Sequence, residues 1–298
     1  MNWGETMTRR QLLATSFAAP FLRTARANRR RPTLCIFSKH LQQYGYEDLA
    51  RVSKDFGFEG VDLTVRPRGH ILPENVTRDL PAAVNAIRAR GLSVPMITTG
   101  LTSGSDPAAE PTIRTASELK VPFFKIGYIR YREAHVLEKL AEVKPGIRAL
   151  AALGEKYGVV AGFHNHSGDY VGALVWDIRE LIHDLDPAWI GYYYDPCHAT
   201  IEGGRFGWRA ALDIALPRLK MVAIKDFYWA RDARGRWQRR MCPLGEGMVD
   251  WDRFFATIAK ARFTGPISLH VEYEPADQHA AIAKDYGFLQ KMVAKYYG

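Results

Sequence analysis

The chain has 298 residues, and 47% of them are hydrophobic, enough for one large folded domain. Its formal net charge of +9 comes largely from arginines in the first 31 residues, and the later charges alternate in sign, which argues against a nucleic-acid partner. Three widely spaced cysteines, Cys35, Cys197 and Cys242, exclude both a disulfide framework and a cysteine-based zinc motif.

Residues 1–27 have the features of an export signal. Arg9-Arg10 precede a short apolar run that ends at Leu22, and Ala25-Arg26-Ala27 provides small residues for cleavage. A twin arginine before a modest apolar segment is typical of proteins exported in the folded state. The run is too short to span a bilayer. We therefore expect no stable membrane insertion, a mature domain over 28–298, and a periplasmic or secreted location.

From residue 33 onward, strand-like and helical segments alternate. The predicted strands are 33–38, 60–65, 92–98, 123–129, 159–166, 190–195, 219–226 and 266–274. The predicted helices are 47–56, 80–90, 111–119, 134–157, 176–185, 208–216, 251–261 and 280–297. Eight strand–helix units predict an α/β fold, a single-domain (β/α)8 TIM barrel. An open doubly wound sheet is the alternative. A glycine-rich phosphate loop after the first strand would favour this alternative, but the sequence has none there, and we expect no nucleotide cofactor.

Strands of a closed barrel turn alternate residues toward the lumen and toward the helices. Where the apolar residues face the helices, the polar ones must face the lumen. The predicted lumen residues are Asp62, Thr64 and Arg66 on the second strand, His164 and His166 on the fifth, Lys225 on the seventh, and Ser268, His270, Glu272 and Glu274 on the last. Burying so many ionisable groups is costly unless they are paired, bind a metal or face water. This pattern predicts an active site at the carboxyl ends of the strands.

Asp195 and His198 follow the sixth strand, where an apolar segment stops at a carboxylate, a proline and an imidazole. Ordinary turn chemistry is the alternative for this pair alone. Carboxylates and imidazoles without thiolates suit a divalent metal such as Mn, Mg, Co or Zn. We predict His166, Asp195 and Glu272 as its ligands. Lys225 complicates this site, because an ammonium repels a cation; it would either replace the metal's charge or hold a substrate oxygen.

Several motifs carry a family resemblance. They are GVDLTVRPRGHILPENV (60–76), FHNHSGDYVGALVWD (163–177), YDPCHATIEGG (194–204), AIKDFYW (223–229), PLGEGMVDW (243–251) and SLHVEYE (268–274). From Thr33 to its end the chain resembles the xylose isomerase-like TIM barrels, the sugar phosphate isomerase/epimerase superfamily that also contains endonuclease IV.

The resemblance implies a metal held by an acid on strand five, an Asp on strand six, a His on strand seven and a Glu on strand eight. Asp195 and Glu272 match this pattern. The strand-five position holds His164 or His166, with Asp169 slightly downstream, and the usual strand-seven His is replaced by Ala223.

We therefore expect an isomerase or epimerase that acts on a free sugar, keto-sugar or glycoside by proton abstraction next to a carbonyl. A metal or Lys225 would polarise the oxygen, Glu272 would take the proton, and His198 would be a second acid–base group. Expelling a substituent instead would give a lyase that performs β-elimination on a keto-glycoside.

Other residues are predicted to contact the sugar, with turn or packing roles as the alternative. They are Arg66, His70, Glu246, Trp229 and His270. A catalytically inactive sugar-binding barrel is a further alternative. Phosphodiester cleavage, as in endonuclease IV, would need a multi-zinc cluster with more His and Glu ligands than this lumen offers, and export argues against nucleic acid. A homo-oligomer is left open.

Overall fold

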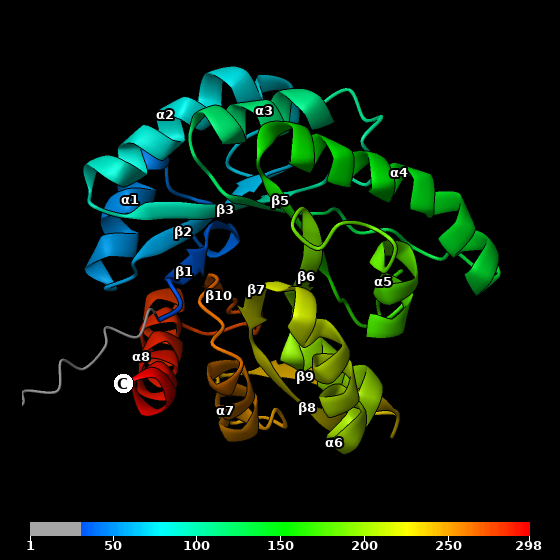
Figure 1. Ribbon diagram of the computed structural model, residues 1–298. Coiled ribbons are helices and arrows are strands. Elements are labelled where there is room, and N and C mark those ends of the chain that lie inside the picture. Colours follow the sequence, from blue (N-terminus) through cyan, green and yellow to red (C-terminus); the bar gives the residue numbers. More distant parts are fainter. Residues whose placement is uncertain (1–30) are drawn as a thin grey trace, which may run out of the picture.

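Eight parallel strands close into a barrel in this protein, seen in a computed structural model that describes residues 31–298 (Figure 1). The predicted export signal lies outside the described residues. In chain order the strands are β1 (Leu34–Phe37), β2 (Gly60–Val65), β3 (Ser93–Thr99), β4 (Phe123–Lys125), β5 (Val160–His164), β6 (Ile190–Tyr194), β7 (Leu219–Ile224) and β10 (Ile267–Leu269). The barrel closes because β1 pairs with both β2 and β10, which confirms the predicted fold.

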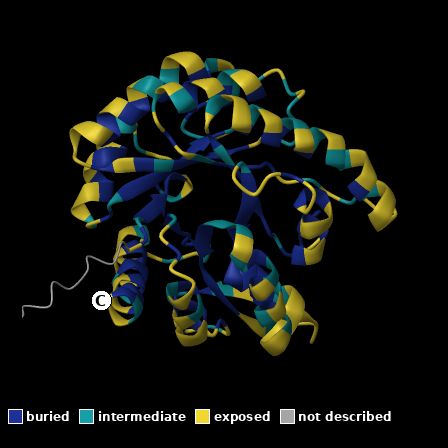
Figure 2. Ribbon diagram, viewed as in Figure 1, coloured by how far each residue is buried: buried dark blue, intermediate teal, exposed yellow. Residues whose placement is uncertain are grey.

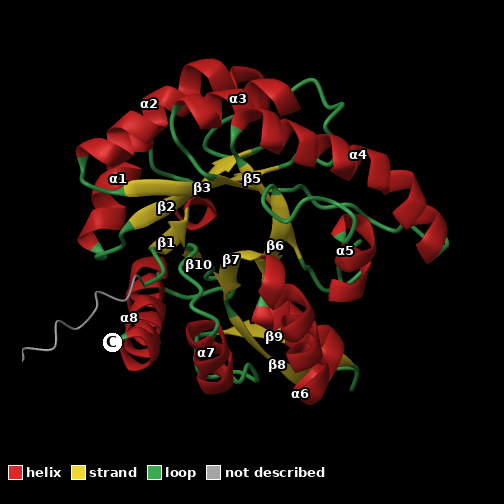
Figure 3. Cartoon of the chain, viewed as in Figure 1, coloured by secondary structure: helices red, strands yellow, loops and turns green. Residues whose placement is uncertain are grey.

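Helices follow the barrel strands and form the outer layer (Figure 3). The α-helices are α1 (Tyr46–Asp55), α2 (Val76–Ala89), α3 (Ala109–Glu118), α4 (Val136–Tyr157), α5 (Val175–Ile182), α6 (Pro196–Ala215), α7 (Trp251–Lys260) and α8 (Gln278–Tyr297). Short 3₁₀ turns are η1 (Ser38–Leu41), η2 (Pro73–Asn75) and η3 (Leu216–Arg218). Within residues 31–298, no helix has the length and apolar character needed to cross a membrane.

The seventh strand ends earlier than predicted, at Ile224, and an antiparallel hairpin follows it. This hairpin consists of β8 (Asp226–Arg231) and β9 (Trp237–Cys242). The side chain of Asp226 fixes its base, because its carboxylate accepts hydrogen bonds from the indole of Trp251 and from three backbone N–H groups between residues 245 and 249. The sequence does not predict this hairpin, since residues 229–240 are rich in charge and lack a clear two-residue alternation.

The alternation predicted within the strands is correct, but the last strand ends at Leu269 instead of residue 274, and Glu274, predicted to face the lumen, is exposed. Ile267, Leu269 and Val271 pack with the helices in the main apolar core, which lies between the barrel and the outer layer (Figure 2). Each fully buried side chain of this kind contributes about 1.5–3 kcal/mol. A separate apolar cluster of Met96, Tyr193, Met221 and Ala223 fills the lower lumen. Gly162 faces this floor, where a Cβ atom would meet Met221 Cε at 1.9 Å. The polar residues at the carboxyl ends of the strands therefore lie above an apolar layer, into which Asp62 and Ser268 alone among the predicted lumen residues extend.

Candidate active site

Asp195 is the centre of the polar cluster, and its backbone is held on both sides. It follows β6 and caps α6, where its Oδ1 accepts the backbone N–H of His198 at 3.0 Å. The amide of Asn165 accepts the Asp195 N–H at 2.8 Å and donates to its C=O at 2.9 Å. The side chain of Asp195 is fully buried. The other carboxylate oxygen, Oδ2, is thereby fixed facing the lumen.

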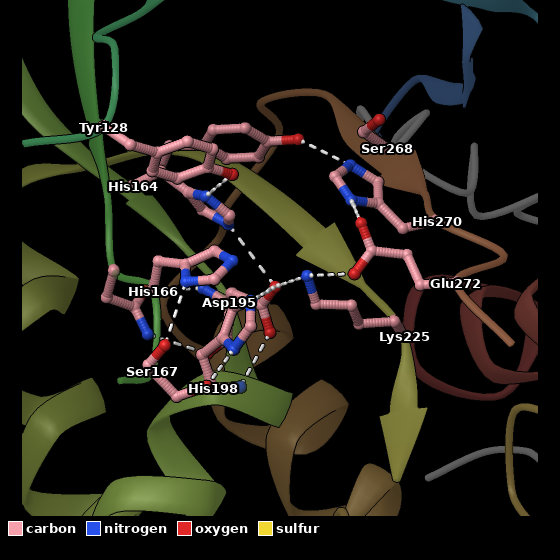
Figure 4. Close-up of polar contacts among 12 residues, drawn as sticks. Tyr128, His164, His166, Ser167, Asp195, His198, Lys225, Ser268, His270 and Glu272 are labelled. Carbon is pink, nitrogen blue, oxygen red and sulfur yellow. Dashed lines mark hydrogen bonds and ion pairs between the residues drawn. The ribbon is translucent and has the colours of Figure 1, made fainter. Parts of the chain in front are cut away.

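Three nitrogens surround this Oδ2 atom (Figure 4). Lys225 Nζ lies 3.2 Å away, His164 Nε2 3.4 Å and His198 Nε2 3.7 Å. Burial of Lys225 lowers its pKa, but Asp195 and Glu272 together raise the pKa above its ordinary value. Burial likewise raises the pKa of Asp195, but Lys225, His164 and the backbone N–H of His198 together outweigh it, so the net shift is downward. Both groups are therefore ionised at neutral pH.

Glu272 is the second partner of Lys225 and faces the open side of the cluster. Its Oε2 lies 3.1 Å from Lys225 Nζ, and its Oε1 lies 3.5 Å from Lys39 Nζ and 3.9 Å from His270 Nδ1. The side chain is 23% exposed. Although burial raises the pKa of Glu272, Lys225, together with His270 and Lys39, holds it well below the ordinary value. Glu272 is thus an ionised carboxylate whose basicity depends on the charge of Lys225.

The hydrogen bonds of His164 and His198 indicate their tautomers. Arg239 Nη1 donates to Ser167 Oγ at 2.5 Å, and Ser167 Oγ lies 2.8 Å from His198 Nδ1. Because a guanidinium can only donate, the Ser167 hydroxyl is free to donate to His198, which leaves the proton on Nε2, facing Asp195. Tyr128 makes the matching contact with Nδ1 of His164 at 3.0 Å. Nε2 of each imidazole therefore faces Asp195 Oδ2 without a hydrogen bond of ordinary geometry, and burial lowers the pKa of His164 to about 4.

His166 differs from these two histidines, because it is partly exposed and one of its nitrogens is free to act as an acceptor. Its Nδ1 lies 3.0 Å from the C=O of Ser167, which can only accept, so the lone pair is on Nε2. Burial lowers the pKa of His166 to about 3, which keeps the ring neutral. In Figure 4, His166 and Glu272 lie on opposite sides of the Asp195–Lys225 pair. A substrate above Lys225 could meet one acid–base group on each side.

The remaining predicted residues divide into two groups. Arg66 and His270 lie near the cluster and share Phe37: the guanidinium carbon is 5.5 Å from its ring centroid, and the imidazole stacks on it at 4.4 Å. His270 Nε2 also contacts Tyr193 Oη at 3.1 Å. His70 is part-buried, with Nδ1 3.3 Å from Thr64 Oγ1.

The second group lies farther out. Glu246 forms an exposed ion pair with Lys284 of α8. Trp229 belongs to the hairpin, is 40% exposed and packs edge-on against Phe227. These two residues are not brought into the Asp195–Lys225–Glu272 contacts.

Several residues of the site were not predicted from the sequence, among them Lys125, Ser167 and Arg239. Lys125 ends β4, is 1% exposed, and directs its Nζ at the Tyr128 ring, 3.3 Å from the centroid. Burial and nearby positive charges lower its pKa well below the ordinary value. Strand alternation could have identified it, because Phe124 packs toward the helices. Arg239 could not have been found in this way, since it comes from the unpredicted hairpin.

Below the cluster, Asp62 is a buried carboxyl group without a basic partner in direct contact among the described residues. It accepts hydrogen bonds from the hydroxyls of Thr98 (2.7 Å), Ser268 (2.8 Å) and Tyr193 (3.3 Å). Burial raises its pKa from 3.8 to about 6, and these hydrogen bonds only partly offset the effect. The folded protein therefore holds this proton more tightly than the unfolded chain.

This shift makes stability depend on pH. Because the folded pKa is the higher one, Asp62 should lower the free energy of unfolding by roughly 3 kcal/mol as pH rises from about 4 to above 6. Asp62→Asn removes this titration. Thermal unfolding of both proteins across this range should show the melting temperature of the variant rising relative to the native protein as pH increases. A difference that is constant with pH would contradict the shift.

The residues present do not fit a divalent metal held by His166, Asp195 and Glu272. Asp195 and Glu272 are bridged by the ammonium of Lys225. Ala223, at the position of the usual histidine, is buried in the lumen floor and offers no side-chain ligand. Within residues 31–298, no group of three or more His, Cys, Asp or Glu side chains is arranged to hold a metal ion.

Comparison with known proteins gives consistent matches. The family model described as xylose isomerase-like TIM barrel matches residues 50–292. An inosose dehydratase of Bacillus velezensis is 24% identical over 155 residues, which cover 47% of this chain and 51% of that protein. This chain therefore matches only about half the length of that relative.

Solved structures agree on the fold. A 3-keto-D-glucoside 4-epimerase from E. coli superposes with a TM-score of 0.68 at 16% identity, covering 88% of this chain and 100% of the other. A xylose isomerase-like TIM barrel protein from Mycobacterium smegmatis, in complex with magnesium, gives a TM-score of 0.68 at 14% identity, covering 90% and 98%. Identities this low show a common fold only.

Proposed function

This chain belongs to the xylose isomerase-like TIM barrel family, and on that premise we propose that it is an epimerase or isomerase of a carbonyl-bearing sugar. The observation that carries the proposal is a buried ammonium, Lys225, fixed between Asp195 and Glu272, with Glu272 and His166 on its two sides. Removing a proton next to a carbonyl needs a fixed positive charge at the oxygen and a base at the carbon. This arrangement offers both.

The first step would use Lys225 and Glu272. Lys225 Nζ donates a hydrogen bond to the carbonyl oxygen, and Glu272 accepts the proton from the neighbouring carbon, which gives an enolate. In the free enzyme, the charge of Lys225 lowers the pKa of Glu272 and so makes it a weaker base. As negative charge develops on the substrate oxygen, it offsets the ammonium and makes Glu272 a stronger base. Base strength therefore rises as the transition state is approached.

The second step would return a proton. If the hydroxyl proton of the enolate moves to the oxygen held by Lys225 and Glu272 returns its own proton to the former carbonyl carbon on the same side, the product is an isomer. If a group on the opposite side supplies it, the carbon is inverted. A water molecule that donates a hydrogen bond to the Nε2 lone pair of partly exposed His166 can be that group, and the proton that Glu272 has taken then neutralises the hydroxide that remains. His198 and His164 would keep Asp195 in place, since their nitrogens are already directed at neighbouring groups.

A lyase is the second candidate, supported by the similarity to an inosose dehydratase. The same enolate can expel a hydroxyl or glycosyl group from the β-carbon, with the proton that Glu272 has taken passing to the leaving oxygen directly or through a water molecule. The first proton transfer is common to both reactions. They differ only in the fate of the enolate.

One experiment tests the proposal and separates the two candidates. Keto-sugars and 3-keto-glucosides, incubated with the enzyme in D₂O, should gain deuterium at the carbon next to the carbonyl. NMR would show an epimer or isomer for the first candidate and an unsaturated ketone for the second. Glu246→Gln, which alters an exposed carboxylate outside the cluster, is the matched control and should exchange normally. If none of these sugars gains deuterium, the proposal is wrong, and the chain is instead a catalytically inactive sugar-binding barrel.

We also propose that the enzyme is exported and works in the periplasm or outside the cell, on the basis of Arg9-Arg10 and the Ala25-Arg26-Ala27 site. Unphosphorylated sugars would then be its substrates. The N-terminal residue of the protein recovered from the periplasm should be near Asn28, and an intact Met1 on cytoplasmic protein would contradict export.

A further inference from the structure

Lys225 lies where two carboxylates converge, a position that a metal ion would favour. Its Nζ is 3.2 Å from Asp195 Oδ2 and 3.1 Å from Glu272 Oε2, and its side chain is only 2% exposed. The family resemblance assigns these same two carboxylates as metal ligands. An ion bound to both would share its ligand oxygens with an ammonium, and two cations repel strongly in a buried site. A divalent ion and the Lys225 ammonium therefore compete for one pair of carboxylates.

The other ligand positions do not offset this repulsion. Ala223 stands at the β7 position, and its methyl group packs with Met221 and Tyr193 in the floor of the lumen. At β5, His164 directs Nε2 toward Asp195 Oδ2, the oxygen that already faces Lys225. A carboxylate there, as the family pattern has, would add negative charge for a divalent ion, whereas a neutral imidazole adds none. Compared with the family pattern, the site lacks an imidazole ligand and an anionic one, and the buried ammonium of Lys225 lies between the two carboxylates that are left.

We infer that this enzyme needs no divalent metal, because the Lys225 ammonium occupies the place and supplies the charge of the ion. Asp195 and Glu272 then serve to hold the ammonium rather than to ligate a metal. The catalytic use of this charge rests on the proposed function. The exclusion of the ion does not, since it depends only on the contacts of Lys225 and on the ligands available.

A metal-binding experiment without substrate tests this inference. The full-length protein would be purified without chelators, its metal content measured by mass spectrometry, and Mn²⁺ and Co²⁺ titrated into the chelator-treated protein by calorimetry. We expect substoichiometric metal and no tight site. Where turnover is measurable, it should be unchanged by chelator treatment. One divalent ion per chain in the purified protein would overturn the inference, whether or not any substrate is turned over.

Variants identify the cause of the exclusion. Ala223→His combined with Lys225→Gln restores an imidazole and removes the ammonium, so it should bind Mn²⁺ or Co²⁺ at least about tenfold more tightly than the native protein. Lys225→Gln alone should give a smaller gain, and it is the fallback if the double variant does not fold. Lys39→Gln removes the exposed lysine beside Glu272 and should leave metal affinity unchanged. If the affinity of folded Lys225→Gln equals that of the native protein, or if Lys39→Gln gains as much as Lys225→Gln, the inference is wrong.

Discussion

Lys225→Met should reduce turnover by about 10²–10³-fold, the usual cost of removing one group that stabilises negative charge on a reacting oxygen. Methionine keeps much of the length of the side chain but cannot donate to the substrate or offset the charge of Asp195 and Glu272. The expected loss is in kcat more than in KM, because the charge that Lys225 stabilises is largest in the transition state. Steady-state kinetics on the sugar that exchanges deuterium would measure it.

Stability must be followed in the same variant. Breaking a buried ion pair by removing one partner costs about 3–5 kcal/mol, because Asp195 and Glu272 are left without the cation they share. Circular dichroism and a melting curve would show whether the variant is folded. Lys39→Met is the matched control, since Lys39 contacts the same Glu272 but is 48% exposed. A folded Lys225→Met protein with near-native turnover would contradict the role of Lys225.

Glu272→Gln should lower turnover by about 10²–10⁴-fold, the usual size of an acid–base contribution. Glutamine preserves the shape of the side chain and can still accept a hydrogen bond from Lys225, but it cannot take a proton from carbon. Substrate affinity should change much less than turnover. Deuterium at the reacting carbon should slow the native enzyme if proton removal limits the rate.

The result for Glu272 can be distinguished from a general loss of charge. Glu274→Gln alters an exposed carboxylate two residues further along and should retain near-native turnover. Deuterium exchange at the carbon should fall with turnover in Glu272→Gln, since both depend on the same proton transfer. If turnover and exchange are both retained, Glu272 is not the base, and His166 is the next residue to replace.

The sequence alone determined the barrel fold and which strand side chains face its lumen. Eight alternating strand and helix segments predicted the fold. The two-residue period of each strand predicted that His164, Lys225 and Glu272 face the lumen while Leu269 and Phe163 face the helices. These are local properties, because a strand that buries its apolar face has only one direction left for its polar face. The twin-arginine segment is likewise a property of the sequence by itself.

Only the tertiary structure decided which lumen residues meet. Asp195, Lys225 and Glu272 follow three different strands, and their contacts depend on strand register and on the reach of a long lysine side chain. Arg239, which orients His198 through Ser167, comes from a hairpin that no periodic pattern indicates. Glu246 was predicted to face the sugar and instead pairs with Lys284. Each of these outcomes depends on contacts between residues distant in the chain, and strand alternation gives the direction of a side chain but not its partner.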